Sequence, residues 1–263
     1  RLESINMFVR IIRRSAPALV GRGFATTSEA AAHGLIEIRE YTVKPEGFAQ
    51  FMKVASEYVG VRKELLPLLG MFTCDMGSCL HRMTHMYSYD SLEQRDAARS
   101  AAVRDPRWKT FLELSRPHMQ YQENKILSEA RPIYQALQLQ PTALFRSPPK
   151  PAAPAKVVYE LRTYQLKPGY GSVPALVEAF SKGLPAKVAA DPEGQLVFFG
   201  HTEVGMLNNV VELWRYPSAQ ACIQARQAAR EVPQWREAIA AIAPGVQHFS
   251  SAFLNPTPFS PWQ

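Results

Sequence analysis

A chain of 263 residues, 46% hydrophobic and 20% charged, has the composition of an ordinary globular protein that can bury a substantial core. The net charge of +7 comes without a dense block of basic residues interleaved with aromatics, which argues against nucleic-acid binding. No apolar run approaches the roughly 20 residues of a membrane-spanning helix, and three cysteines are too few for a disulfide framework.

The N-terminal segment has the composition of a targeting sequence. From Met7 it reads MFVRIIRRSAPALVGRGFATTSE, which is rich in arginine and free of acidic residues until its last position. These features are typical of a mitochondrial transit peptide, and an arginine two residues before the bond predicts cleavage between Phe24 and Ala25. We interpret residues 1–34 as a transit peptide or disordered N-terminus, with an ordinary basic helix as the alternative. Residues 1–6 precede the first candidate initiator and take no part in the interpretation.

Two stretches of the chain repeat each other. IEIREYTVKP at 36–45 matches YELRTYQLKP at 159–168. Farther on, the segment 89–111 matches the segment 216–238, including a shared ARxAA phrase and a shared Pro-x-Trp. The matches follow in the same order at nearly constant offset, which predicts a duplicated structural unit.

Each unit predicts the same elements in the same order. The opening stretch alternates with the period of a strand, and its Lys-Pro leads into a helix with apolar residues at helical spacing. Two further strands are expected in each unit, at 70–76 and 80–89 in the first and at 195–202 and 208–216 in the second. A second helix and a closing strand complete the order βαββαβ, which is the ferredoxin-like pattern.

The second helix of each unit carries its own signals. Ser91 and Ser218 are expected to cap its N-terminus, and Ser91 stands at capping-box spacing from Gln94. Trp108 and Trp235, which recur at matching positions, are interpreted as anchors of this helix on the sheet.

These elements predict an α+β fold in which two tandem ferredoxin-like units face each other with their antiparallel sheets, as an α+β barrel. We expect the first unit at 35–144 and the second at 157–258. Between them, residues 145–156 contain four prolines within seven positions and are interpreted as an extended linker.

The opening strands carry the most distinctive polar residues. Side chains two apart on a strand share a face, so each glutamate is expected to pair with the arginine that follows it. We expect the aliphatic face to pack on the helices and the polar face to point into the barrel. There it forms either a structural ion-pair network or a ligand site, from these residues: Glu37, Arg39, Tyr41, Glu160, Arg162 and Tyr164.

The nearest approach to a metal site consists of Cys74, Cys79, His81 and His85, because the last three are expected on one strand face and zinc takes such ligands. The second unit has no equivalent residues, and free cysteine is a common core residue. No spacing singles out a histidine as a haem ligand either. No metal, cofactor or catalytic residue is therefore assigned.

The sequence resembles the NIPSNAP family. The stretch YELRTYQLKPG at 159–169 is close to the signature strand and helix start of that family, and the two related units, the linker and the transit-like segment add to the likeness. The family often has His-aliphatic-Trp on a strand, where this chain has HMY at 85–87 and ELW at 212–214.

The resemblance implies a mitochondrial protein of the matrix or inner-membrane surface that acts through protein–protein contacts, including the autophagy of damaged mitochondria, without established catalysis. Its expected partners are mitochondrial proteins, with homo-oligomerisation left open and no nucleic acid or transmembrane segment. Two alternatives stay open. One is a small-ligand-binding or enzymatic α+β barrel, such as a cofactor-independent monooxygenase or a haem binder, and the other is an accessory subunit of an inner-membrane respiratory assembly.

Overall fold

The computed structural model describes residues 34–149, 156–191 and 193–263. The expected transit peptide and its cleavage site lie outside these residues, as does half of the expected proline-rich linker. Among the helices that the structure describes, none combines the length and the apolar character needed to cross a membrane.

The first unit has the predicted order βαββαβ, with both helical segments divided in two. Its third strand starts two positions later than expected, at Arg82. The elements are β1 (Leu35–Val43), α1 (Phe48–Glu57), α2 (Val59–Leu65), β2 (Leu68–Met76), β3 (Arg82–Tyr89), α3 (Leu92–Arg104), α4 (Pro106–Ser115) and β4 (Met119–Glu129).

The second unit repeats this order with one difference in its first helix. In unit one, Pro45 opens a 3₁₀ turn that runs directly into α1, whereas in unit two the helix begins only at Ser172 and continues unbroken. The short helix α5 (Arg131–Leu137) precedes the unit and was not predicted. The elements of unit two are β5 (Val158–Leu166), α6 (Ser172–Ala190), β6 (Gln195–Val204), β7 (Asn209–Tyr216), α7 (Ala219–Arg230), α8 (Pro233–Ile242) and β8 (Val246–Pro256).

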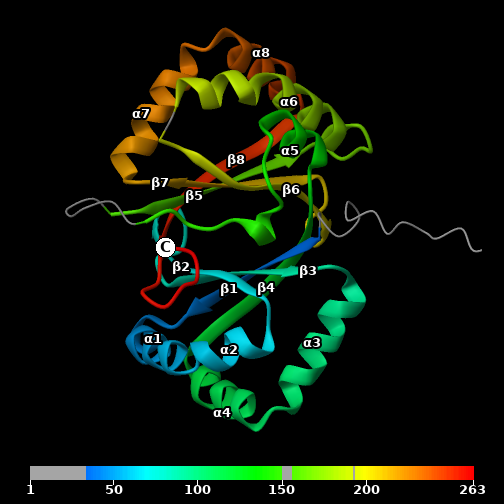
Figure 1. Cartoon of the computed structure of the whole chain (residues 1–263). Helices are drawn as coiled ribbons and strands as arrows, with labels where there is room; N and C mark the ends of the chain where they lie inside the picture. The colour runs from blue at the N-terminus through cyan, green and yellow to red at the C-terminus, as the bar shows by residue number, and fades with distance from the viewer. Residues whose placement is uncertain (1–33, 150–155, 192) are drawn as a thin grey trace, which may run out of the picture.

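The strands close into one antiparallel barrel in the order β1-β3-β2-β8-β5-β7-β6-β4 (Figure 1). Each unit contributes four neighbouring strands, and the two sheets are joined edge to edge by the pairs β2–β8 and β4–β6. Figure 1 shows the helices in two outer layers, with α1 to α4 below the barrel and α6 to α8 above it. The predicted α+β barrel is confirmed, and hydrogen bonding at both seams leaves no free edge.

The barrel interior is filled by apolar side chains from both units. This core contains Ile36 and Ile38 of β1, Tyr159 and Leu161 of β5, and the C-terminal Trp262, all at most 8% exposed. The expected assignment of the two strand faces is therefore wrong: the aliphatic face of β1 and β5 points inward, and the Glu-Arg-Tyr face points outward, toward the helices. A buried carboxylate needs a cationic partner, and the helices supply arginines, whereas the inward side chains around Ile36 and Ile38 are apolar.

The helices pack on the outer faces of the barrel through the expected anchors. Trp108 and Trp235 are 5% and 6% exposed and belong to the cores beneath α4 and α8. The side chain of Ser91 accepts a hydrogen bond from the Gln94 amide at 3.2 Å, and Ser218 accepts one from the Ala221 amide at 3.1 Å. Both N-caps are thus formed as predicted.

Candidate functional site

A buried carboxylate is the centre of the polar side chains beneath α3. Glu37 of β1 is fully buried and accepts a hydrogen bond from Arg39, on the same strand, at 3.0 Å. Two arginines of α3 also donate to it, Arg95 at 2.9 Å and Arg99 at 2.6 Å. Asn124 of β4 adds a fourth hydrogen bond at 2.9 Å. The carboxylate is therefore fully partnered on the helix side of the sheet.

The same layer continues toward α2 with aromatic and basic groups. The Nε of Arg39 donates to the Tyr41 hydroxyl at 3.2 Å, and the Tyr41 ring meets His85 edge-on with centroids 4.6 Å apart. Arg62 of α2 is buried and donates to the Tyr87 hydroxyl. His85 is also fully buried, and neither ring nitrogen has a hydrogen-bond partner among the described residues. The unit-one cluster, as we call this group, consists of Glu37, Arg39, Tyr41, Arg62, His85, Arg95 and Arg99.

Unit two holds a related group beneath α7. Glu160 of β5 is fully buried and accepts hydrogen bonds from Arg226 at 2.6 Å, from Ser251 at 2.9 Å and from the Cys222 thiol at 3.2 Å. The Nε of Arg162 lies 3.7 Å from the same carboxylate. The glutamate and arginine of each opening strand therefore pair with each other, as expected, although outside the barrel.

Unit two also buries a lysine where unit one buries Arg62. The Nζ of Lys187, on α6, lies 3.6 Å from the centroid of the Trp214 ring and has no hydrogen-bond partner among the described residues. The Trp214 indole donates to Glu212 at 2.5 Å. The unit-two cluster, as we call this group, consists of Glu160, Arg162, Tyr164, Lys187, Glu212 and Arg226.

Both clusters lower the pKa of the buried glutamate on their opening strand. Burial by itself raises the pKa of Glu37, but the hydrogen bonds and charges of Arg95, Arg99 and Arg39 lower it to about 2. Burial also opposes the ionisation of Glu160, and the charges of Arg162 and Arg226 bring its pKa below the ordinary value.

The equivalent tyrosines shift in opposite directions. Burial raises the pKa of Tyr41, but the charges of Arg39, Arg62 and Arg99 outweigh it and lower that pKa. Burial raises the pKa of Tyr164, and the nearby Glu212 raises it further, well above the ordinary value. The electrostatic environment of unit one therefore favours negative charge more strongly than that of unit two.

The two clusters were expected to face each other inside the barrel, but they do not. In the barrel order, β1 and β5 are separated by three strands in either direction, so they occupy opposite walls. Their polar side chains point away from the interior, into separate helix–sheet layers. Each cluster is therefore a site of its own unit.

The residues weighed as metal ligands are also dispersed. Cys79 and His81 precede β3, so only His85 of the three lies on that strand. The Cys74 side chain belongs to the barrel interior, whereas His81 packs on Phe48 of α1 at a ring-centroid distance of 5.3 Å. Within the described ranges, no group of three or more His, Cys, Asp or Glu side chains is arranged to hold a metal ion.

The sequence interpretation missed the helix residues of both clusters. Arg99 and Arg226 are the arginines of the repeated ARxAA phrase, which was used only as evidence of the duplication. A glutamate and an arginine that both recur at matching positions were the available signal for an ion pair. Arg62 and Lys187 gave no such signal, because a lone basic residue on a helix is usually solvated.

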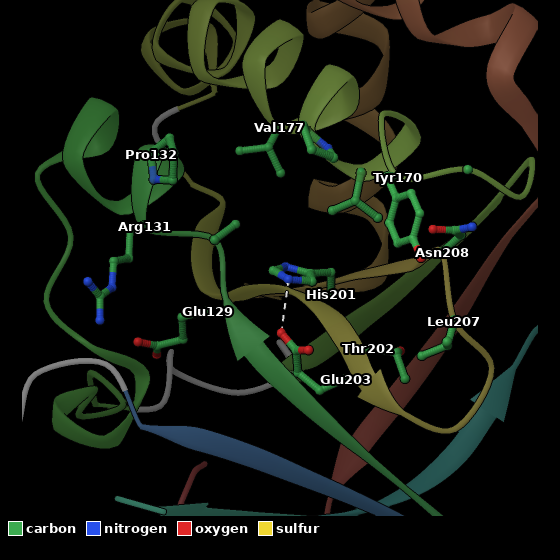
Figure 2. Close-up of a pocket in the computed structure, with 14 residues that line it drawn as sticks. Glu129, Arg131, Pro132, Tyr170, Val177, His201, Thr202, Glu203, Leu207 and Asn208 are labelled. Carbon is green, nitrogen blue, oxygen red and sulfur yellow. Dashed lines mark ion pairs between the residues drawn. The ribbon is translucent and has the colours of Figure 1, made fainter.

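A surface cleft lies at the other end of unit two (Figure 2). It has a volume of about 750 Å³ and is lined by residues of α5, α6, β6 and the turns that precede α6 and β7. In Figure 2, Val177 and Pro132 stand above the cleft, Tyr170 and Leu207 lie on one side of it, and His201 projects into its centre. Its size is that of a site for a small molecule or a short peptide segment.

The rim of this cleft exposes large apolar side chains. Tyr170 is fully exposed, and Met206 and Leu207, in the turn between β6 and β7, are 70% and 59% exposed. The Gln165 side chain holds this turn by donating to the Leu207 carbonyl at 3.0 Å. The polar lining includes His201, whose Nε2 lies 3.2 Å from the Glu203 carboxylate (Figure 2).

Comparison with known proteins places these features in a family. The NIPSNAP family model matches residues 36–131 and 159–261, one match in each unit. Protein NipSnap homolog 3B of Mus musculus is 32% identical over 243 residues, covering 90% of each chain. Protein NipSnap homolog 3A of Homo sapiens is 30% identical over 254 residues, covering 95% of this chain and 94% of the relative.

Solved structures share the fold at low sequence identity. A candidate monooxygenase from Lactobacillus acidophilus superposes with a TM-score of 0.57 at 12% identity, covering 85% of this chain and 94% of the other. An anthrone oxidase-like protein gives a TM-score of 0.54 at 15% identity, covering 87% and 93%. Identities this low show a common fold alone. On the family match and the sequence identities together, this chain belongs to the NIPSNAP family.

Proposed function

We propose that this chain acts through protein–protein contacts, and that the cleft of unit two receives an apolar segment of the partner. The observation that carries the proposal is the open cleft lined by the exposed side chains of Tyr170 and Leu207, with the exposed Met206 next to Leu207 in the same turn. Contiguous exposed apolar surface of this kind marks interaction sites on folded proteins. The space between the two sheets, the other candidate for a binding site, is occupied by core side chains.

The repeat offers an internal comparison that supports this choice. At the corresponding place in unit one, His81 packs edge-on against Phe48. The equivalent positions in unit two are Asn208 and Gly171, which cannot make this aromatic contact. The ring contact of unit one therefore has no counterpart beside Asn208, which lines the cleft of unit two.

The partner's chemistry follows from the lining. Val173 and Val177 stand one helical turn apart on α6 and offer two apolar contacts. Arg131, at the start of α5, lines the cleft and is exposed. It forms no ion pair with another residue that the structure describes. We therefore propose a segment with two apolar anchors and one acidic side chain placed opposite Arg131, which also suits the net charge of +7.

The test is selection of short peptides by the purified chain, followed by fluorescence polarisation with a selected peptide. Leu207→Asp is expected to weaken binding at least tenfold, because it places a charge on the apolar rim. The matched control is Leu80→Asp, in the equivalent turn of unit one, where the leucine is 58% exposed against 59% for Leu207. Arg131→Glu is expected to weaken binding of an acidic peptide. Replacement of the acidic residue of that peptide by lysine is expected to restore binding to the variant.

Two results would contradict the proposal. If no peptide is selected at micromolar concentration, the cleft does not bind an apolar segment. If Leu80→Asp and Leu207→Asp weaken binding equally, the contact does not lie in the cleft of unit two.

The proposed location of the chain is the mitochondrion. This proposal rests on the composition of the N-terminal segment and on the family resemblance. We propose that residues 1–34 direct the chain to the matrix or the inner-membrane surface, where it contributes to mitochondrial homeostasis and the signalling of damaged mitochondria. Fusion of these residues to a fluorescent protein tests the targeting step. Diffuse fluorescence, unchanged when the arginines are replaced by glutamine, would contradict it.

A further inference from the structure

The unit-one cluster buries more positive than negative charge. Arg39, Arg95 and Arg99 bond one buried carboxylate, that of Glu37, and the buried Arg62 of the same layer bonds the Tyr87 hydroxyl instead. The only further acid bonded to these arginines among the described residues is Asp96, which is 73% exposed and pairs with the outer side of Arg95 at 3.0 Å. Buried cations are tolerated when anions compensate them. With Asp96 counted, this layer holds two more cations than anions, although the side chains of Arg39, Arg95 and Arg99 are each about one-fifth exposed.

The repeat shows that the fold itself does not demand this excess. The equivalent of His85 in unit two is Glu212, and the equivalent of Arg95 is Cys222. Each exchange makes unit one more positive by one charge. The unit-two cluster, with three cations and two carboxylates, has an excess of one positive charge, so the larger excess belongs to unit one.

The excess charge is accompanied by donors that have no partner. The Nη2 of Arg62, the Nε of Arg95 and the Nε of Arg99 are buried without a hydrogen-bond partner among the described residues. Both ring nitrogens of His85, which is 0% exposed, also lack a partner among the described residues, and a neutral imidazole offers one donor and one acceptor. Buried polar groups without partners cost free energy, and a ligand with several acceptor oxygens would satisfy the donors among them.

We propose that the unit-one cluster binds a small oxyanion, a phosphate or carboxylate group, between α2, α3 and the sheet. Arg62, Arg95 and Arg99 supply the charge, and His85 supplies a hydrogen bond from the strand. Arg95 and Arg99 have side chains that are 21% and 19% exposed, so the cluster reaches the surface at α3. This inference is independent of the proposed function, because it concerns the other unit and a polar ligand.

The experiment measures the melting temperature of the full chain in inorganic phosphate or acetate against chloride at constant ionic strength, with native mass spectrometry of bound phosphate. A saturable rise with either anion is expected, and the anion that saturates at lower concentration identifies the preferred group. His85→Glu places the unit-two residue in unit one and is expected to abolish the response, because the new carboxylate compensates the arginines. Arg95→Gln is expected to weaken the apparent affinity at least tenfold.

The matched control is Arg226→Gln, which removes the equivalent arginine of the other cluster and is expected to leave the anion response unchanged. If His85→Glu fails to fold, Arg95→Gln alone decides the question. Equal responses of Arg95→Gln and Arg226→Gln would show unspecific binding and overturn the proposal. A wild-type chain without a saturable response would also overturn it.

Discussion

Removal of the Glu37 carboxylate is the most direct test of the charge arrangement beneath α3. Glu37→Gln keeps the shape of the side chain but leaves Arg39, Arg95 and Arg99 without their common anion. Breaking a buried ion pair from one side is costly, because the remaining charges stay buried without compensation.

The magnitude follows from the pKa of this carboxyl. The arginines lower the pKa of Glu37 from 4.5 to about 2, and at roughly 1.4 kcal/mol per pKa unit the carboxylate contributes about 3 kcal/mol of stability at neutral pH. Because the folded pKa lies below the unfolded one, this contribution is present above about pH 5 and is lost as the pH falls toward about 2. At pH 3 the difference between wild type and variant is expected to narrow to about 1 kcal/mol.

The assay is urea unfolding followed by tryptophan fluorescence in phosphate-free buffer at pH 7 and pH 3. The control is Glu113→Gln, which removes an exposed carboxylate of α4 and is expected to change the free energy of unfolding by less than about 0.5 kcal/mol. A Glu37→Gln effect of the same size at both pH values would refute the reasoning, since it would not depend on ionisation.

Three further outcomes are expected. Burial lowers the pKa of Lys187 to about 8, so Lys187→Met is expected to raise the free energy of unfolding at pH 7 by about 1–3 kcal/mol. Calorimetry should show this gain shrinking between about pH 8 and pH 10, because the folded wild type has lost the Lys187 proton there while the unfolded chain still holds it, and the stability of the wild type therefore rises with pH. A constant gain would contradict this expectation. Ser91→Ala and Ser218→Ala are each expected to lower the free energy of unfolding in urea by about 1 kcal/mol. The two losses should add in the double variant, because the caps lie in separate layers. Strong non-additivity would indicate coupling between the units. Burial raises the pKa of the Cys222 thiol to about 12, so iodoacetamide is expected to modify Cys79 first, as followed by mass spectrometry; earlier loss of Cys222 would show that the layer beneath α7 opens readily.

The element order could be predicted because its signals are local. Strand alternation around Ile36, the caps at Ser91 and Ser218, and the recurring tryptophans each depend on a few neighbouring residues, and the repeat allowed each to be checked twice. The continuous helix α6 could not be predicted locally, because it runs unbroken through Pro185, whereas its counterpart in unit one breaks at Tyr58.

The orientation of the strands could not be predicted in the same way. Period-two alternation separates two faces of β1, but both faces are buried here, one by the opposite sheet and one by helices. Hydrophobicity alone cannot then decide which face is inside. The decision came from arginines of α3 that lie 58 and 62 positions after Glu37 and can pair with it only on the outer face.

The sequence by itself determined the duplication, the βαββαβ order of each unit, the pairing of each opening glutamate with its arginine, and the family, because these depend on patterns within short segments. Only the tertiary structure decided that the polar faces point outward, that Arg62 and His85 join the Glu37 layer, and that the cleft beside Tyr170 stays open. The physical reason is that charge compensation and cavity shape arise between elements distant in the chain. In this protein, two units of common sequence pattern acquired different sites through such contacts.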